Sequence, residues 1–487
     1  MTKRHLIPVL LLAWLPAVAQ EPAAPKTESI KGVVRKNLAP VSDAVLQVKL
    51  PRPVERTLKN GLKVLIMENH RVPTIEVELL IPASTVSDPA GLAGVADATA
   101  DLLRQGGTAT RSSRQIADEL SAMGARLYVG ASWGARTTRL SGGALSEYFD
   151  RWLAIASDVL LNATYPQDEF EKWRKRQLAA LLQQRANPSF LGNERLYAVL
   201  YGGDPRALTS ATRESLEKMT REDLLAFRKR FYVPGQSLLG ITGDITPDQA
   251  VAKLEKALAG WQAASVAEPA LGAKPPIAEK KIYLVNRPDS VQTLLILGNH
   301  AIDRLSPDYI PCLVLNQVLG AGPASRLFVN IREEKGFTYG VYSRFTAQKF
   351  LDQFSASSSV RTEVTGAALD EFLKEFRKVR EEPVPQEELT NAKHAMVGRF
   401  ALSLENQSGI LDQMMSLREY GLPADYWDTY PAKVMAVTAA DVQRVAQKYI
   451  PLDNLQIVAV GDAGKIRDVL KKYGPVEEYT TEGKKVQ

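Results

Sequence analysis

The chain carries an internal repeat, and this repeat restricts what the sequence can fold into. Residues 219–244 align without a gap on residues 437–462, which lie 218 positions further along the chain. A second match pairs Pro166–Phe170 with Pro385–Leu389 at a shift of 219. Two separate matches at almost the same shift predict two similar halves rather than one large domain.

Each copy of the repeat contains the same predicted helix start. Thr220 stands three positions before Asp223, and Thr438 stands three positions before Asp441. This spacing is a variant of the capping box, in which the threonine and the acidic side chain satisfy free N–H groups at a helix N-terminus. An apolar strand and a Gly-Asp turn follow in both copies. The repeat therefore predicts a helix followed by a strand at the end of each half.

The Ala- and Pro-rich segment 263–278 falls between the two copies and is typical of a linker. We accordingly expect an N-terminal domain at 54–262 and a C-terminal domain at 279–475. Residues 20–53 are expected to form an extended lead-in and residues 476–487 a tail.

Strand and helix patterns mix without the steady strand-helix-strand order of a doubly wound protein. Asn60-Gly61, between two apolar runs, predicts a hairpin with a type I′ turn. Helical patterns occur near 88–105, 113–123, 145–161, 167–185 and 211–231. We therefore predict an α+β fold of two homologous halves, each with antiparallel β-sheets packed against helices, joined by the linker into a clamshell.

The N-terminus has the three parts of a secretory signal peptide. Lys3 and Arg4 give a positive start, Leu6–Leu15 is an apolar run, and Ala17-Val-Ala19 is a small-residue cleavage site. An apolar run of this length spans only about 15 Å as a helix, half of a bilayer core. We expect residues 1–19 to be cleaved, no membrane span to remain, and the protein to reach the bacterial periplasm.

The net charge, the single cysteine and the spacing of the histidines argue against several classes of function. The formal net charge of +6 includes the two leader cations and is too small to indicate nucleic-acid binding. Cys312 is the single cysteine, so no intrachain disulfide can form, and its apolar neighbours predict a buried side chain. Beyond the leader, the histidines are far apart and are not spaced as metal ligands: His70, His300 and His394.

A helix is predicted after Asp88-Pro89, with the aspartate as its cap and the proline in its first turn. Gly106-Gly107 is expected to end it. The sequence between them starts Gly-Leu-Ala-Gly-Val-Ala-Asp-Ala at residue 91 and closes with Gly-Gly-Thr. It resembles the metal helix of the insulinase/pitrilysin family of zinc peptidases, which reads Gly-Leu-Ala-His-x-x-Glu-His. That family includes insulin-degrading enzyme and mitochondrial processing peptidase.

The resemblance implies that this chain lacks the family's zinc site. In the family register, Gly94 and Ala98 take the positions of the two metal imidazoles, and Asp97 takes that of the catalytic glutamate. The third ligand, a glutamate in a later helix, falls on Ala180, and another family acid falls on Trp173. Glycine and alanine offer no side-chain donor to zinc, so we expect no metal in this chain.

Asp97 and Asp101 share one face of the same predicted helix. An acidic pair of this kind could hold a hard cation. Because the face lies opposite the apolar stripe, we instead expect both carboxylates to be solvated.

The second half contains a Gly-rich turn followed by a predicted helix and strand. The buried edge of the helix, which Gly336 ends, is expected at Leu327, Phe328 and Ile331. Alternation predicts a strand through Phe337, Tyr339 and Val341. Taken alone, Arg332 would be a solvated cation at the helix end and Tyr339 a core aromatic.

This segment resembles the C-terminal signature of the same family, a Gly-rich turn, then Ser-Arg-Leu, then Arg-Glu-x-x-Gly-x-x-Tyr. In the family, the arginine and the tyrosine contact the substrate bound at the zinc. The resemblance places these roles on Arg332, which would grip backbone carbonyls, and on Tyr339, whose phenol would stabilise oxyanion charge. Gly320 and Gly322 would let the main chain approach the substrate.

These features predict a non-catalytic subunit of a secreted zinc peptidase. It would close a peptide chamber over a zinc-bearing homologous partner, as a heterodimer, and donate Arg332 and Tyr339 in trans. Zinc would be bound by the partner alone. The resemblance implies that the substrates are unfolded peptides, which the family binds by β-strand addition to a sheet edge.

Two alternatives remain open. One is a peptide-binding or structural scaffold of the same fold without a peptidase role, similar to the core subunits of respiratory complexes. The other is a hydrolase with a new site, for example a serine site, although the chain has no Gly-x-Ser-x-Gly nucleophile elbow. A neighbouring gene for a secreted homologue with an intact His-x-x-Glu-His would favour the subunit.

Overall fold

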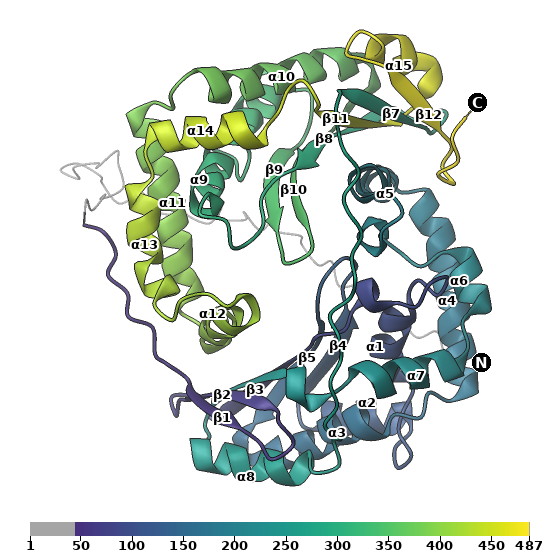
Figure 1. The fold of residues 1–487 in the computed structure, drawn as a ribbon, viewed down its shortest axis with the longest axis vertical. Coiled ribbons are helices and arrows are strands. Elements are labelled where there is room, and N and C mark those ends of the chain that lie inside the picture. Colours follow the sequence, from purple (N-terminus) through teal and green to yellow (C-terminus); the bar gives the residue numbers. More distant parts are fainter. Residues whose placement is uncertain (1–43, 487) are drawn as a thin grey trace, which may run out of the picture. The chain divides into compact units, whose positions relative to one another are not determined.

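Two six-stranded β-sheets form the framework of residues 44–486, the part of the chain described by this computed structural model (Figure 1). The first sheet has the order β1-β2-β6-β3-β5-β4, with strands Val54–Thr57 (β1), Lys63–Glu68 (β2), Thr74–Ile81 (β3), Arg126–Ala131 (β4), Thr138–Leu145 (β5) and Leu238–Gly243 (β6). The second has the order β12-β7-β11-β8-β10-β9, with strands Lys281–Asn286 (β7), Gln292–His300 (β8), Val341–Ala347 (β9), Asp352–Arg361 (β10), Gln456–Gly461 (β11) and Val476–Tyr479 (β12). The predicted signal peptide 1–19 and residues 20–43 of the predicted lead-in lie outside the described residues.

The two sheets repeat one another, and both are mixed. β2, β6 and β3 recur 218 residues later as β7, β11 and β8, in the same order along the sheet. β2 runs parallel to β6, and β7 runs parallel to β11 and β12, whereas the remaining pairs are antiparallel. The α+β class and the two homologous halves are confirmed, with parallel pairs that the purely antiparallel expectation did not include.

Helices cover the sheets in both halves. The first half contains Val95–Gln105 (α1), Ser113–Ala122 (α2), Phe149–Asn162 (α3), Gln167–Arg185 (α4), Pro188–Tyr201 (α5), Arg213–Lys218 (α6), Arg221–Phe231 (α7) and Pro247–Ala257 (α8). The second half contains Tyr309–Leu319 (α9), Thr365–Glu381 (α10), Gln386–Ser403 (α11), Gln407–Tyr420 (α12), Tyr426–Ala436 (α13), Ala439–Tyr449 (α14) and Ala463–Leu470 (α15). Short 3₁₀ turns lie at Thr85–Ser87, Ser146–Tyr148, Pro205–Ala207, Pro234–Gln236 and Thr362–Val364, and a π-helix spans Phe328–Glu334. None of the helices within 44–486 is long and apolar enough to cross a membrane.

The two predicted capping boxes are present at the starts of α7 and α14. The Asp223 N–H donates to the Thr220 hydroxyl at 3.3 Å, and the Asp223 carboxylate accepts from the Thr220 N–H at 2.7 Å. Thr438 and Asp441 repeat both hydrogen bonds, each at 3.1 Å. The same local chemistry therefore starts the equivalent helix in each half.

Three local expectations were wrong. In the β1–β2 hairpin only Gly61 has a positive φ, +86°, and the Leu58 N–H donates to the Leu62 carbonyl. The turn therefore ends in one left-handed glycine and is not type I′, which needs positive φ at both central residues.

The helix predicted at 211–231 is divided at Met219, between α6 and α7. The expected tail contributes β12, which pairs with β7 and completes the second sheet.

Helix α5 is the main element that the sequence did not predict. Most of its residues are at least half-buried, so it shows no polar face from which an amphipathic helix could be identified. It packs on β8 and β11 of the second sheet, whereas its own sequence belongs to the first half (Figure 1). Shifted by 219 residues, α5 coincides with α12, and α12 packs on β6, the equivalent of β11. The halves thus exchange one helix each.

Close packing at both crossings requires a glycine. A Cβ on Gly192 of α5 would lie 2.8 Å from side-chain atoms of both Leu294 and Ile296 in β8. At the other crossing the glycine is on the strand: a Cβ on Gly240 of β6 would lie 2.5 Å from Met415 and 2.9 Å from Leu411 of α12. At the first crossing the small residue is on the helix and the large residues are on the strand. At the second crossing the small residue is on the strand and the large residues are on the helix. Both arrangements allow the helix to approach the sheet closely.

We predict that Gly192→Val destabilises the protein by about 1–3 kcal/mol, because the new side chain overpacks the α5 crossing. Gly398→Ala is the matched control, since Gly398 is an exposed helical glycine of α11 with no atom near its Cβ position. That control should gain about 0.5–1 kcal/mol. Urea unfolding measures both changes, and a Gly192→Val variant as stable as the unmodified protein would contradict the tight crossing.

Candidate functional site

The helix at the family's metal position begins later than predicted. Val95 is its first residue, and the Asp88 carboxylate accepts hydrogen bonds from the N–H groups of Gly94, at 2.6 Å, and Ala96, at 2.8 Å. Asp88 does cap this helix, but from six residues before Gly94, because a tight turn at Pro89–Leu92 intervenes. Burial raises the pKa of Asp88 to about 7, although these two N–H donors act in the opposite direction.

Gly94 has a backbone that a histidine would adopt only with strain. Its φ is +97°, in the left-handed region that favours glycine. A Cβ there would also lie 2.8 Å from the Ala211 Cβ, and Trp133 is 3.6 Å away. Ala98 is fully buried on the same helix. Gly94, at the first metal position of the family, therefore offers no donor, and its backbone conformation and close neighbours leave no room for a side chain.

Asp97 and Asp101 are not simply solvated, contrary to the expectation from the sequence. Both are half-buried, because α4 and α7 pack against α1. Burial raises the pKa of Asp97 to about 7, and the nearby Asp101 adds to the shift. Burial also raises the pKa of Asp101, which accepts a hydrogen bond from the indole N–H of Trp173 at 3.1 Å. The predicted helix face was correct, but the covering helices could not be foreseen.

Zinc does not fit this set of side chains. Gly94 and Ala98 have no donor, Ala180 on α4 has none, and the buried Trp173 ring donates its N–H to Asp101. Within residues 44–486 no three His, Cys, Asp or Glu side chains come together in a way that could hold a metal ion. The family's metal site is therefore replaced by a packed helix interface.

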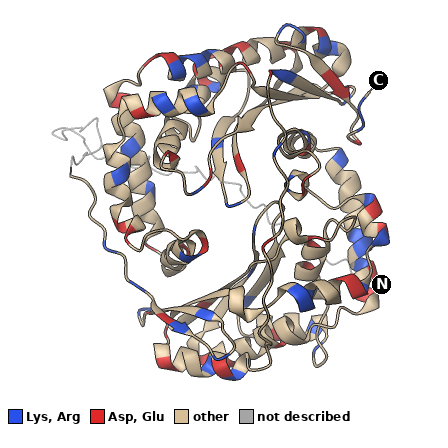
Figure 2. Ribbon diagram, in the orientation of Figure 1, with Lys and Arg blue, Asp and Glu red and all other residues tan. Residues whose placement is uncertain are grey.

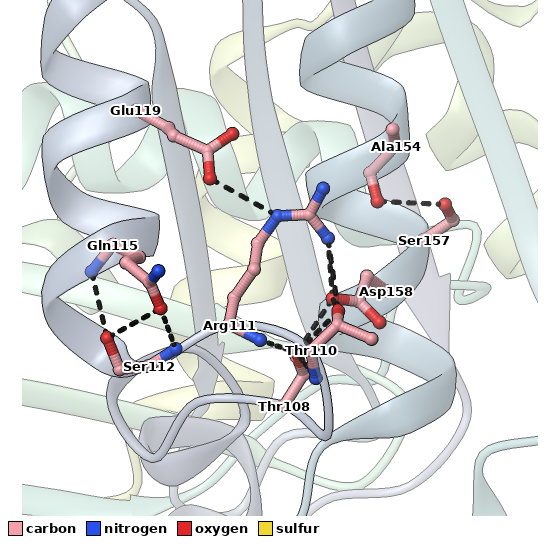
Figure 3. Close-up of polar contacts among 9 residues, drawn as sticks. All are labelled: Thr108, Thr110, Arg111, Ser112, Gln115, Glu119, Ala154, Ser157 and Asp158. Atoms are coloured by element: carbon pink, nitrogen blue, oxygen red, sulfur yellow. Dashed lines mark hydrogen bonds and ion pairs between the residues drawn. The ribbon is translucent and has the colours of Figure 1, made fainter.

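The connection after α1 is held by Asp158 of α3 (Figure 3). Gly107, with a φ of +82°, turns the chain out of the helix as predicted. The Asp158 carboxylate accepts hydrogen bonds from the hydroxyls of Thr108 and Thr110, at 2.7 and 2.8 Å, and from the Arg111 guanidinium at 2.7 Å. Burial acts to raise the pKa of Asp158, but these hydrogen bonds and that of Asn162 outweigh it and lower the pKa. The Gly-Thr close of the family motif is thus a structural anchor.

In the second half, Arg332 lies on a π-helix rather than on the predicted α-helix. Asn330, on the same π-helix, donates to Glu371 at 2.9 Å and to Glu375 at 2.7 Å, and both acceptors belong to α10. Gly336, with a φ of +61°, ends the helical segment as predicted. Single-turn π segments are frequent at functional sites, where the wider turn re-aims side chains.

The structure brings Arg332 and Tyr339 together. The Arg332 Nε donates to the Tyr339 carbonyl at 3.2 Å, its guanidinium lies 5.0 Å from the Phe328 ring centre, and it forms an ion pair with Glu333. The Tyr339 side chain is 91% exposed, and no residue within 44–486 hydrogen-bonds its hydroxyl. The interpretation of Tyr339 as a core aromatic was wrong.

The strand predicted through Phe337 begins only at Val341. The Thr338 hydroxyl hydrogen-bonds the carbonyls of Gly340, at 3.0 Å, and Ser359, at 2.7 Å, which holds the segment as a loop. Loop geometry therefore explains why Tyr339 points away from the sheet core.

In the Gly-rich turn at 320–323, the packing of β9 requires a glycine at one position, Gly320. The Ser343 N–H donates to the Gly320 carbonyl at 2.9 Å, and a Cβ on Gly320 would lie 2.4 Å from the Ser343 hydroxyl. Gly320 therefore allows the close approach of β9. Gly322 has no atom within 4 Å of its Cβ position, which leaves it open to a ligand.

Comparisons with known proteins agree with the two motifs. A family model described as insulinase (peptidase family M16) matches residues 63–211, and one described as the peptidase M16 inactive domain matches residues 218–396. Together they span most of the chain. The chain belongs to the M16 peptidase family, which confirms the resemblance found in its sequence.

Several relatives match more than two thirds of this chain. It is 23% identical over 354 residues to the uncharacterized zinc protease YmxG of Bacillus subtilis, covering 72% of this chain and 84% of that protein. It is 25% identical over 408 residues to the non-peptidase homolog YmxG of Helicobacter pylori, covering 82% and 92%. Among solved structures, the peptidase M16 inactive domain from Pseudomonas fluorescens is similar with a TM-score of 0.77 and 27% identity, over 85% of this chain and 98% of that one. A Helicobacter pylori protease, at 18% identity, shares the fold with a TM-score of 0.79, over 85% and 100%.

We predict that Gly94→Ala destabilises the protein by at least about 1–2 kcal/mol, because alanine must adopt a left-handed backbone and meet Ala211. Gly203→Ala is the control, since no atom lies within 4 Å of its Cβ position. Thermal unfolding measures both variants. Equal melting temperatures for Gly94→Ala and the unmodified protein would contradict the account of this position.

A second prediction concerns pH. A carboxyl whose pKa is about 7 when folded and about 3.9 when unfolded binds more protons in the folded state between these values, so folding stability falls as pH rises from about 4 to 7. Asp97→Asn removes this loss. The variant should be more stable at pH 8 by at least about 1.4 kcal/mol and equal to the unmodified protein near pH 4. Asp118→Asn, at an exposed site on α2, is the control, and urea unfolding across pH is the measurement. A constant difference at all pH values would refute the assignment.

Proposed function

We propose that this chain is the non-catalytic subunit of an exported M16 peptidase. It acts with a homologous partner that carries an intact zinc helix, and it contributes Arg332 and Tyr339 to the peptide held there. On its own it hydrolyses no peptide. The predicted signal peptide supports a periplasmic site of action.

The free phenol of Tyr339 is the observation that carries this proposal. A tyrosine that is 91% exposed gains nothing from burial within its own chain, and its hydroxyl is available as a donor. A phenol placed at a carbonyl under attack stabilises the negative charge that develops on the oxygen. Because Gly94, Ala98 and Ala180 offer no metal donors, we place the attacked carbonyl at the zinc of another subunit.

Arg332 is prepared for the same role. Its Nε is fixed by the Tyr339 carbonyl and its plane rests over the Phe328 ring, while its Nη2 has no partner within residues 44–486. A guanidinium held in this way can donate to a peptide carbonyl with little further loss of side-chain freedom. The contact between Arg332 and the Tyr339 backbone also couples the positions of the two groups.

The sheet edges supply a place for the rest of the peptide. β4 and β9 stand at corresponding ends of the two sheets, each with one side unpaired within the described strands. An extended peptide can add to such an edge through main-chain hydrogen bonds, which gives broad sequence tolerance. β9 follows Tyr339 almost directly, so a peptide along this edge would pass beside it.

The alternative is a peptide-binding or structural scaffold with no peptidase role. The description of the Helicobacter pylori relative as a non-peptidase homolog favours it. The two functions differ in whether a partner's activity depends on Arg332 and Tyr339.

We predict that mixing this chain with a zinc-bearing M16 homologue from the same organism produces peptidase activity that neither protein has alone. Tyr339→Phe should lower kcat/KM of the mixture by about 10- to 1000-fold, because one donor to the oxyanion is lost. Arg332→Gln should lower it by at least about tenfold. Cleavage of a quenched fluorescent peptide is the measurement.

Tyr148→Phe, which removes a hydroxyl far from this loop in sequence and without a hydrogen-bond partner among the described residues, should leave the activity unchanged. Full activity in both the Tyr339 and the Arg332 variants would refute donation in trans. It would leave the scaffold function as the better account.

A further inference from the structure

A small polar pocket lies between the start of α5 and the strands β8, β10 and β9. Its volume is about 230 Å³, below the roughly 300–1,000 Å³ of a pocket for a drug-sized ligand, so it suits one side chain or one chain end. Leu294 and Ile296 of β8 line it with apolar surface. The polar lining residues are Ser189, Asn193, Tyr342, Ser343, Arg344, Ser355 and Ser357.

The register of the sheet explains why these side chains converge. Arg344 of β9 is the cross-strand partner of Ser355 of β10, and Tyr342 is the partner of Ser357. Cross-strand partners point to the same face, and alternate residues along a strand share that face. On the other side of Ser355 its partner in β8 is Gly298, which has no side chain to cover the serine. A cation and two hydroxyls thus face a space roofed by α5.

The pocket has donors that the protein itself does not use. Arg344 has no carboxylate within ion-pair distance in the described part of the chain, and the pocket lining contains no acidic residue. Ser355 is only 8% exposed, yet its hydroxyl has no hydrogen-bond partner within residues 44–486. The Ser355 oxygen is not fully enclosed, so this hydroxyl and the unpaired guanidinium are both free to donate to an acceptor that enters the pocket from outside the chain.

The electrostatics favour an anion with one charge. Ser189 lies in the first turn of α5, where the helix dipole adds a positive potential. Arg344 is the single charged residue of the lining. Recognition of a phosphate usually requires a cluster of arginines, whereas one guanidinium matches one carboxylate through two parallel hydrogen bonds.

We propose that this pocket binds a carboxylate of a bound peptide, supplied by the C-terminus or by an Asp or Glu side chain. The proposal rests on the proposed peptide-binding function and adds a specificity site to it. Tyr342 connects the pocket to the Arg332 surface, because its ring lies 5.7 Å from the Phe328 ring over which Arg332 packs. A peptide extended along β9 therefore meets Tyr339 and Arg332 first and Arg344 further along the same edge.

Calorimetric titration of the full chain with three short peptides tests this pocket without any partner. The peptides share one sequence without acidic residues: one has a free C-terminal carboxylate, one has a C-terminal amide, and one has the amide and a single internal Glu. The carboxylate that fits the pocket should lower Kd by at least about tenfold relative to the neutral amide. The two acidic peptides distinguish a chain end from a side chain.

Arg344→Gln should abolish this preference without changing the Kd of the neutral amide, and Ser355→Ala should reduce the preference. Arg114→Gln, at an exposed arginine of α2, is the charge-matched control and should retain it. Equal Kd values for all three peptides, or a preference that survives Arg344→Gln, would overturn the pocket assignment. Tight binding of the neutral amide with no carboxylate preference would overturn the carboxylate pocket but not the proposed peptide-binding function.

Failure of all three peptides to bind would also overturn the carboxylate pocket. The proposed subunit function would then still be tested by the effect of Tyr339→Phe on the activity of the mixture.

Discussion

The exchange of helices between the two halves is the constraint on which the rest of the structure depends. α5 belongs to the first repeat and packs on the second sheet, and α12 belongs to the second repeat and packs on β6 of the first. Separating the halves would expose both helices and the glycine-lined crossings beneath them. The pocket proposed to bind a carboxylate lies where α5 covers the polar face of β9 and β10. The proposed specificity site therefore depends on the packing of α5, a helix of the first half, on the sheet of the second half.

The two halves have been adapted in different directions. In the first half, α1 begins after a left-handed glycine, and its acidic residues Asp97 and Asp101 are half-buried against α4 and α7. In the second half, a π-helix fixed to α10 by Asn330 holds Arg332 beside an exposed tyrosine. Sequestered carboxylates cost stability at neutral pH, whereas an exposed phenol contributes nothing to it. The exposed phenol is the physical basis for proposing that the second half carries the functional surface.

Much of this organisation could be predicted from the sequence, and the failures have identifiable causes. The repeat and the capping boxes at Thr220 and Thr438 depend on local chemistry and were predicted correctly. Helix α5 was not, because packing on a foreign sheet leaves it without a polar face. The solvation of Asp97 was misjudged, since burial by α4 and α7 is a tertiary property. The π-helix was missed because Leu327, Phe328 and Ile331 fit either helix type. Alternation through β10 places Ser355, Ser357 and Ser359 on one face, but the buried Ser358 on the opposite face interrupts this pattern in the sequence.

The central claim is that this chain contributes to peptide cleavage without binding zinc. The most direct test is the zinc content of the purified chain after equilibrium dialysis against zinc, measured by mass spectrometry alongside a homologue with an intact His-x-x-Glu-His helix. We predict no stoichiometric zinc and no chelator-sensitive cleavage from this chain, against one zinc in the homologue. One tightly bound zinc per chain, together with peptide hydrolysis that a chelator abolishes, would contradict the account.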